Sequence, residues 1–326
     1  MNWKTYYRDE MTQPATKAYL EGLFDSFHED REMNVLVRRG AILSFPHTAA
    51  HYIGPLQARV VSGLYRTGIK RVIALGVLHT SVLSAPYDED YRTAIDSERS
   101  PSERLRAYAL LRGGFVPKVH LIETAFGKIP CGGIADDQTE AVRIDRMGVL
   151  NNEFSLDSFF SLMSLYARMH GISPITVSPL YIGMTRDPVS GAFAAADDIV
   201  AFLRSVRDPD TAIVTTGDIV HYGTAYTPVE KMLDKKEEDL EPFFRGECER
   251  IISLAIRKQD LAGAFRDSNE ILRSDQRYIL PVIAKYLGSN AAFRKLSFSL
   301  SDYSQILGTA RPCVVASALV AYDPAA

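Results

Sequence analysis

The sequence of 326 residues has few cysteines, no long apolar run and no large excess of one charge. Its three cysteines, Cys131, Cys248 and Cys313, are isolated from one another and form no CxxC pair. We therefore expect neither a disulfide framework nor a structural zinc site. No run of about 18 apolar residues is present, which argues against a membrane span. The net charge of −3 gives no reason to expect nucleic-acid binding.

The start of the chain lacks the apolar core that a secretory signal requires. Together with the unpaired cysteines, this predicts a cytoplasmic protein. Hydrophobic residues make up 46% and charged residues 24% of the sequence, which is typical of globular proteins. No repeat or low-complexity linker divides the chain. We therefore predict a single α/β domain over residues 1–326, in which residues 1–30 form an N-terminal extension that includes a helix.

Apolar runs and helical patterns alternate along much of the chain. The pattern predicts a strand at 40–45, a helix that opens at Gly54-Pro55, and a strand at 71–77, because proline is favoured in the first turn of a helix. Such a unit places its two strands in parallel. Further helices are predicted at 16–28, 103–111, 159–169, 194–206, 248–256 and 274–287, and further strands at 119–122, 174–181 and 212–216. The late apolar runs 296–300 and 314–322 are expected to pair as antiparallel strands.

These elements predict a mixed, mainly parallel sheet flanked by helices. Three histidines, His47, His79 and His221, follow the ends of its predicted strands. Ligands of α/β proteins gather outside the carboxyl ends of the strands. If these strands are neighbours, the three imidazoles meet in one pocket, where they suit Fe, Zn, Cu or Ni. Asp218, three residues before His221, is expected to orient that histidine.

His51, four residues after His47, is open to two interpretations. It is either a further metal ligand or an acid/base group that faces a substrate. For all of these histidines the competing interpretation is a core or loop residue whose ring nitrogens are satisfied by backbone groups. Two histidines and one carboxylate, with open positions beside them, are the arrangement of non-haem Fe(II) oxygenases.

Four segments in this order resemble the Memo-like family (system protein B of the AmmeMemoRadiSam type). They read Pro46-His47-Thr48-Ala49-Ala50-His51-Tyr52-Ile53-Gly54, Gly76-Val77-Leu78-His79, Pro179-Leu180-Tyr181-Ile182-Gly183 and Thr215-Thr216-Gly217-Asp218-Ile219-Val220-His221-Tyr222-Gly223. The resemblance spans about residues 40–322. That family shares its fold with the class III extradiol dioxygenases, so the resemblance implies the same fold here.

The resemblance implies that His47 and His79 bind a metal and that Asp218 and His221 face the same pocket. Two departures from the family pattern change the expected site. Phe154 and Phe159 stand where the family has histidines at the start of a helix. Ser274 stands where the family has a cysteine ligand, so the third ligand is expected to be a neighbouring acid, Asp275 or Glu270.

The resulting functional prediction is a metal-dependent dioxygenase-like enzyme that acts on a small hydroxylated, aromatic molecule. Fe(II) is the expected metal, with Zn or Cu as alternatives. His221 and His51 are the predicted acid/base groups, with Asp218 behind His221, and Phe154, Phe159 and Tyr52 are predicted to form an apolar wall.

Two other functions stay open. One is a non-catalytic binding or adaptor protein that recognises a peptide or small ligand in the same pocket. The other is hydrolysis by a zinc-bound water. The expected partner is a small molecule rather than nucleic acid or a membrane, and the sequence allows a homo-oligomer.

Overall fold

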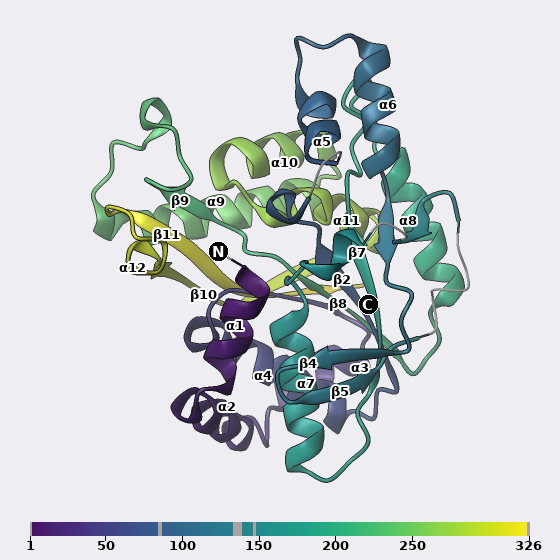
Figure 1. The fold of residues 1–326 in the computed structure, drawn as a ribbon, viewed down its shortest axis with the longest axis vertical. Helices are drawn as coiled ribbons and strands as arrows, with labels where there is room; N and C mark the ends of the chain where they lie inside the picture. Colours follow the sequence, from purple (N-terminus) through teal and green to yellow (C-terminus); the bar gives the residue numbers. More distant parts are fainter. Residues whose placement is uncertain (1, 84–86, 133–138, 146–147, 325–326) are drawn as a thin grey trace.

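A nine-stranded mixed sheet forms the centre of the fold, and helices cover both of its faces (Figure 1). The computed structural model of the protein describes residues 2–83, 87–132, 139–145 and 148–324. The sheet has the strand order β10-β11-β1-β8-β2-β7-β3-β6, and β9 pairs with β11. This arrangement confirms the predicted α/β class with a mixed, mostly parallel sheet flanked by helices.

The strands of the main sheet are β1 (Ile42–Phe45), β2 (Arg71–Val77), β3 (Gly114–Val116), β6 (Val142–Ile144), β7 (Thr176–Ile182), β8 (Thr211–Thr216), β9 (His221–Gly223), β10 (Ala292–Asp302) and β11 (Cys313–Asp323). A separate hairpin joins β4 (Leu121–Thr124) to β5 (Gly127–Pro130). As expected, the two late strands β10 and β11 pair antiparallel along their lengths. None of the helices within the described residues is long and apolar enough to cross a membrane.

The helices are α1 (Trp3–Thr12), α2 (Pro14–Ser26), α3 (Arg31–Arg38), α4 (Ala50–Arg66), α5 (Tyr87–Ile95), α6 (Pro101–Leu111), α7 (Asp157–Met169), α8 (Ala194–Val206), α9 (Glu237–Ile256), α10 (Leu261–Asp267), α11 (Leu280–Leu287) and α12 (Ser304–Leu307). Helices α2, α3, α4 and α7 pack on one face of the sheet and α8, α9 and α11 on the other. Side chains of a strand alternate between these faces, so Leu43 and Phe45 of β1 join the first core while Ile42 joins the second.

Strand β8 lies between β1 and β2 and is parallel to both. The sequence predicted that β1 and β2, joined by one helix, would form a parallel pair. They are parallel, but they do not pair with each other, because the chain returns much later to insert β8 between them. The carboxyl ends of β1, β8 and β2 therefore lie side by side, and His47, Asp218 and His79 follow these three ends.

The chain before residue 40 is more helical than the sequence predicted. Besides the helix predicted at 16–28, residues 3–12 form α1 and residues 31–38 form α3, neither of which was predicted. Helix α4 begins at Ala50, so Pro55 lies inside it rather than at its first turn. Proline has no N–H to donate to the carbonyl of His51 four residues earlier. The Tyr19 hydroxyl of α2 lies 3.5 Å from that carbonyl oxygen and donates to it instead.

Helix α1 is held against the rest of the protein by Arg8. Its guanidinium binds both carboxylate oxygens of Asp157, at 2.6 and 2.7 Å, and donates to the Glu123 carbonyl at 2.6 Å. The Asp157 side chain is 7% exposed, so it is largely shielded from water. Bidentate arginine–carboxylate pairs of this kind are among the stronger polar contacts in proteins.

We expect Arg8→Met to lower the free energy of unfolding by about 1–3 kcal/mol, because the Asp157 carboxylate would stay buried without its partner. The matched control is Arg92→Met, which breaks a pair with Asp88 whose arginine is 75% exposed. That control should cost no more than about 0.5 kcal/mol. Urea unfolding of both variants checks the prediction. Equal losses would show that Arg8 is not an anchor for α1.

Candidate metal centre

His47 is fixed by three contacts just beyond the end of β1. Its backbone N–H donates to Asp218 Oδ1 at 3.1 Å, and its ring Nδ1 lies 3.1 Å from Thr216 Oγ1 at the end of β8. Its Nε2 faces His79 Nε2 at 3.1 Å. The side chain is 2% exposed. These contacts direct the Nε2 lone pair of His47 toward the other groups of the site.

His79, just beyond β2, is oriented by Glu153. Its Nδ1 donates to Glu153 Oε1 at 2.9 Å, and its backbone N–H donates to Oε2 of the same carboxylate at 2.8 Å. With one proton held on Nδ1 by Glu153, Nε2 is the ring nitrogen of His79 that can bind a metal once its own proton has left. Glu153 is 1% exposed and also accepts the backbone N–H groups of Phe154 and Ser155. No role was predicted for Glu153 from the sequence.

His221, at the start of β9, is oriented by a backbone carbonyl. Its Nδ1 donates to the carbonyl oxygen of Arg273 at 3.0 Å. The predicted partner, Asp218, instead lies on the other side of the ring, with Oδ2 3.9 Å from His221 Nε2. The Nε2 lone pair of His221 therefore faces the interior of the site, as do those of His47 and His79.

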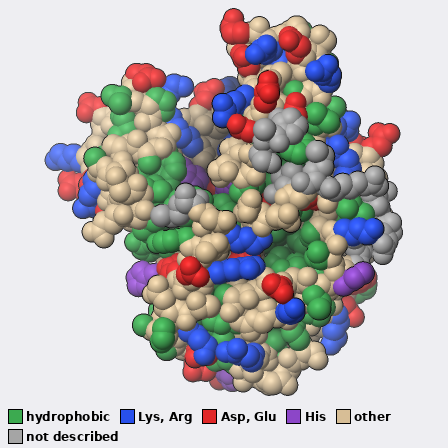
Figure 2. Space-filling view, viewed as in Figure 1, with side chains coloured by type: hydrophobic (Ala, Val, Ile, Leu, Met, Phe, Trp, Pro, Cys, Tyr) green, Lys and Arg blue, Asp and Glu red, His purple; other side chains and the backbone are tan. Residues whose placement is uncertain are grey.

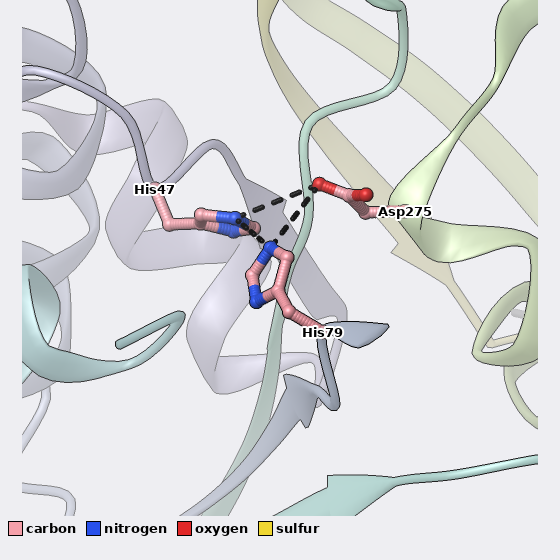
Figure 3. A group of neighbouring side chains, drawn as sticks. All are labelled: His47, His79 and Asp275. Atoms are coloured by element: carbon pink, nitrogen blue, oxygen red, sulfur yellow. Dashed lines mark hydrogen bonds and ion pairs between the residues drawn. The ribbon is translucent and has the colours of Figure 1, made fainter. Parts of the chain in front are cut away.

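Asp275 faces the three histidines, and Figure 3 shows it opposite two of them, His47 and His79. Its Oδ2 lies 3.6 Å from Nε2 of His47, 3.6 Å from Nε2 of His79 and 3.7 Å from Nε2 of His221. This buried oxygen has no hydrogen-bond partner within the described parts of the chain. Glu270, the other predicted acid, lies exposed on the π-helix Ser268–Leu272. The structure thus brings Asp275, and not Glu270, to the histidines.

Asp275 is placed there by its neighbour Gln276. The Gln276 amide donates to Ser44 Oγ of β1 at 2.6 Å, which anchors the 3₁₀-helix Asp275–Tyr278 to the sheet. Gly217 makes room for this contact, since a Cβ at that position would lie 2.4 Å from Gln276 Cγ. The backbone N–H of Asp275 also donates to the Asp218 carbonyl at 3.0 Å. The segments after β8 and before α11 are therefore held together at the site.

The donor atoms are spaced as ligands of one metal ion would be. Two ligands that each bind a divalent metal at about 2.1 Å lie roughly 3.0–3.4 Å apart in octahedral or tetrahedral geometry. The distances of 3.1 and 3.6 Å among His47, His79 and Asp275 are close to this range, and His221 lies 3.7 Å from Asp275 Oδ2. Asp275 Oδ2, which has no hydrogen-bond partner within the described residues, and the imidazole nitrogens around it favour a cation between them. Two overlapping groups, His47–His79–Asp275 and Asp218–His221–Asp275, can hold a metal ion.

The site also attracts positive charge. Burial disfavours a charged His79, but the carboxylates of Glu153 and Asp275 outweigh it and raise the pKa of His79 to about 10. Burial and the adjacent His79 lower the pKa of His47 to about 3. Burial alone would raise the pKa of Asp275, but His221 and His79 lower it. The proton on His79 thus supplies positive charge at the position where a bound metal ion would supply it.

The pKa of Asp218 is shifted in the opposite direction to those of Glu153 and Asp275, the other two carboxylates of the site. It is buried, and burial together with the charge of Asp275 raises its pKa well above the ordinary value. Its Oδ1 is engaged by the backbone N–H of His47, while Oδ2 lies between His47 and His221, at 3.8 and 3.9 Å from their Nε2 atoms. Asp218 is therefore a group that can hold a proton inside the site.

The centre opens into a cavity of about 420 Å³ that is rich in aromatic side chains. Figure 2 shows a recess in the upper left of the molecule, with histidine visible at its base. Phe154 stacks on His79 with ring centroids 4.3 Å apart, and Tyr7 of α1 packs on Phe154 at 5.8 Å. The aromatic residues that line the cavity are Trp3, Tyr7, Phe154, Tyr226 and Tyr303.

Three residues that the sequence assigned to the pocket lie elsewhere. His51 is exposed on α4 and packs against Tyr19, with ring centroids 5.8 Å apart. Phe159 is buried in the core against Phe45, at 4.4 Å. Tyr52 lies behind Tyr303 rather than in the cavity lining. Of the predicted apolar wall, only Phe154 faces the site.

The structure adds residues that the sequence did not single out. Trp3 and Tyr7 come from α1, and Tyr226, Tyr303 and Arg273 come from loops and short segments after residue 220. The spacing of Trp3 and Tyr7 places both on one face of a helix, which was the available signal for α1.

A scan of the sequence against protein-family models gives no match, and a search of curated proteins finds no similar sequence.

Proposed function

We propose that this protein is a Memo-like, metal-dependent enzyme of the dioxygenase type that uses Fe(II) and acts on a small hydroxylated, aromatic molecule. The observation that carries the proposal is the orphaned Oδ2 of Asp275, which faces the Nε2 atoms of His47, His79 and His221 at 3.6–3.7 Å. The order of the four Memo-like sequence segments supports it further. Asp275 follows Ser274, so it supplies an acid where the family has a cysteine ligand.

His47, His79 and Asp275 would hold the metal, which forms the two-histidine, one-carboxylate set of non-haem iron oxygenases. When bound, Fe(II) in such a set supplies open positions for a hydroxylated substrate and for O2. Other residues of the site would accept a proton and exclude water. His221 Nε2 faces the cavity with a free lone pair and accepts the proton of a substrate hydroxyl. Phe154 and Tyr7 provide an apolar surface that excludes water from the reacting groups.

Asp218 supports this proton transfer. Its carboxyl lies 3.9 Å from His221 Nε2, so a hydroxyl or a water molecule between them would bridge the two groups. Burial and the charge of Asp275 raise the pKa of Asp218, which favours a protonated carboxyl that can donate within the site. His221 and Asp218 would then act as the acid/base pair, without His51.

The proposal is tested by loading the protein with Fe(II) under anaerobic conditions and following O2 consumption with a panel of catechols. We expect turnover that needs iron, and we expect His221→Ala to keep the iron but lose turnover. Bound zinc with hydrolytic activity would favour the zinc-water alternative. A protein that binds no metal and has the same melting temperature with and without chelator would contradict the proposal and favour a binding or adaptor role.

Metal affinity is expected to rise with pH. In the metal-free site His79 holds a proton up to its pKa of about 10, so a metal ion must displace that proton. Loss of one proton on binding gives an increase of about tenfold in affinity per pH unit between pH 6 and 8. Competition of Co(II) between the protein and a chromogenic chelator at several pH values measures the slope. A flat profile would show that no proton is released.

A further inference from the structure

A second cavity lies outside the metal centre, among α5, α6, α10 and the loop after β7 (Figure 1). It has a volume of about 280 Å³ and shares no lining residue with the cavity at the histidines. No aspartate or glutamate of the described residues lines it. The polar residues of its lining are Tyr91, Arg104, Arg186, Asn269 and Tyr278. Positive charge therefore gathers at this cavity without a carboxylate to balance it.

Arg186, in the loop after β7, brings a guanidinium without a partner among the described residues. The residue is partly buried, and its buried Nε has no hydrogen-bond partner. The other guanidinium nitrogens likewise form no hydrogen bond or ion pair with the described parts of the chain. The guanidinium lies over the ring of Phe265, 5.2 Å from its centroid, and Phe265 lines the cavity. Stacking on an aromatic face leaves the N–H groups at the edge of a guanidinium free to bind an anion.

Arg104 of α6 brings a second guanidinium to the cavity. Its Nη2 donates to the carbonyl oxygen of Pro188 at 2.7 Å, and its Nε to that of Ala94 at 3.3 Å. Pro188 lines the cavity, so the first contact places the guanidinium at the cavity wall. Both partners are uncharged carbonyls, and Arg104 forms no ion pair with a described residue. Its charge is therefore not neutralised, and its Nη1 keeps N–H groups for a ligand.

Arg277 adds a third positive charge behind Tyr91. Its Nη2 donates to the Tyr91 hydroxyl at 3.4 Å and its Nη1 to the Ser274 carbonyl at 2.9 Å, and both acceptors are uncharged. Tyr91 lines the cavity and accepts from Arg277, so its own O–H can be donated. Arg104, Arg186 and Arg277 thus place three like charges in or beside one small cavity. An anion in the cavity would offset their mutual repulsion.

We propose that this second cavity binds the phosphate group of a small phosphate monoester, and that Arg186 and Arg104 recognise its dianion. Two guanidinia match two negative charges, whereas one guanidinium is sufficient to pair with a carboxylate. The rings of Phe265 and Tyr278, 5.3 Å apart, provide an apolar surface for the organic part of the ester. The volume is close to about 300 Å³, the lower end of the range for small-molecule sites. The site is separate from the metal centre and does not depend on the proposed enzymatic function.

Phenyl phosphate and methyl phenyl phosphate provide a matched pair of probes at pH 8. They differ by one methyl group, and only the first carries two negative charges. Calorimetry with the metal-free, full-length protein should show phenyl phosphate binding at least about tenfold more tightly, since it can accept an additional charge-assisted hydrogen bond. Arg186→Gln should abolish this preference, and Arg186→Lys should retain part of it.

Arg204→Gln is the matched control. Arg204 also lies over an aromatic ring, that of Tyr286 at 5.7 Å, and donates to a backbone carbonyl, but it does not line the cavity. The preference for phenyl phosphate should be unchanged in this variant. Because the Arg186 guanidinium has no hydrogen bond or ion pair within the described residues, Arg186→Gln should melt close to the wild type. Should it fail to fold, Arg104→Gln removes the other guanidinium and should abolish the same preference.

Equal binding of the two probes, or an unchanged preference in Arg186→Gln, would overturn the proposal. Tighter binding of inorganic phosphate than of phenyl phosphate would overturn the assignment to an ester. The only tryptophan of the sequence, Trp3, lines the cavity at the metal centre, so its fluorescence should not respond to phenyl phosphate. A response that persists in Arg186→Gln would place the ligand at the metal centre and would also overturn the proposal.

Discussion

The double variant His47→Ala/His79→Ala is expected to lose its bound metal. Both imidazoles place Nε2 beside Asp275 Oδ2, so their removal leaves Asp275 alone of the three proposed ligands. Loss of a single residue that only orients a ligand already lowers metal affinity by about 10–100-fold. Loss of two ligands should therefore exceed about 100-fold. Elemental analysis after anaerobic loading with Fe(II) should find stoichiometric metal in the wild type and little in the variant.

The matched control is His51→Ala/His120→Ala, which removes two exposed histidines. This control should bind metal as the wild type does, because neither side chain lines the cavity. Equal metal content in the two double variants would show that the ion binds elsewhere, and the metal centre would have to be abandoned. Circular dichroism of each variant separates loss of the site from loss of the fold.

The parts of the fold that were predictable are those with a strong local pattern. Strand β2 and helix α8 occupy the predicted ranges 71–77 and 194–206, since uninterrupted apolar runs and helical spacing do not depend on partners. The insertion of β8 between β1 and β2 was not predictable in this way. The insertion concerns the order of strands in the sheet, which the local sequence of each strand does not determine. Helix α1 carries only a weak local signal, the spacing of Trp3 and Tyr7, and its position depends on distant contacts such as that of Arg8 with Asp157.

The site was predictable to the extent that it follows strand ends. Three neighbouring parallel strands end at one edge of the sheet. The residues that follow these strands therefore lie close together there, as their positions in the sequence suggested; they are His47, His79 and Asp218. The assignment of His51 depended on where α4 begins. With a start at Ala50, His51 falls on the outer side of the first turn, where it is exposed. Arg273 escaped notice because its left-handed backbone and the contact of its carbonyl with His221 are properties of the folded chain.

Replacement of Glu153 is expected to affect both stability and metal binding. In Glu153→Leu, the backbone N–H groups of His79, Phe154 and Ser155 would lose their buried acceptor, and His79 Nδ1 would lose its partner. Breaking a buried charged network by removing one member costs about 3–5 kcal/mol. We expect a loss of this size in urea unfolding of the metal-free protein. Glu123→Gln, at a residue whose side chain is 70% exposed, should cost no more than about 0.5 kcal/mol.

Glu153→Gln separates the two effects. Its amide oxygen can still accept N–H groups, but its NH2 would face the backbone N–H of His79, a donor against a donor. The Gln side chain also has no charge to hold the proton on His79 Nδ1, so the imidazole would be a less basic and less ordered ligand. We expect metal affinity to fall about 10–100-fold, with a smaller loss of stability than in Glu153→Leu. Unchanged affinity in Glu153→Gln would mean that this carboxylate supports only the fold, whereas a loss confined to metal binding would identify it as the residue that orients His79.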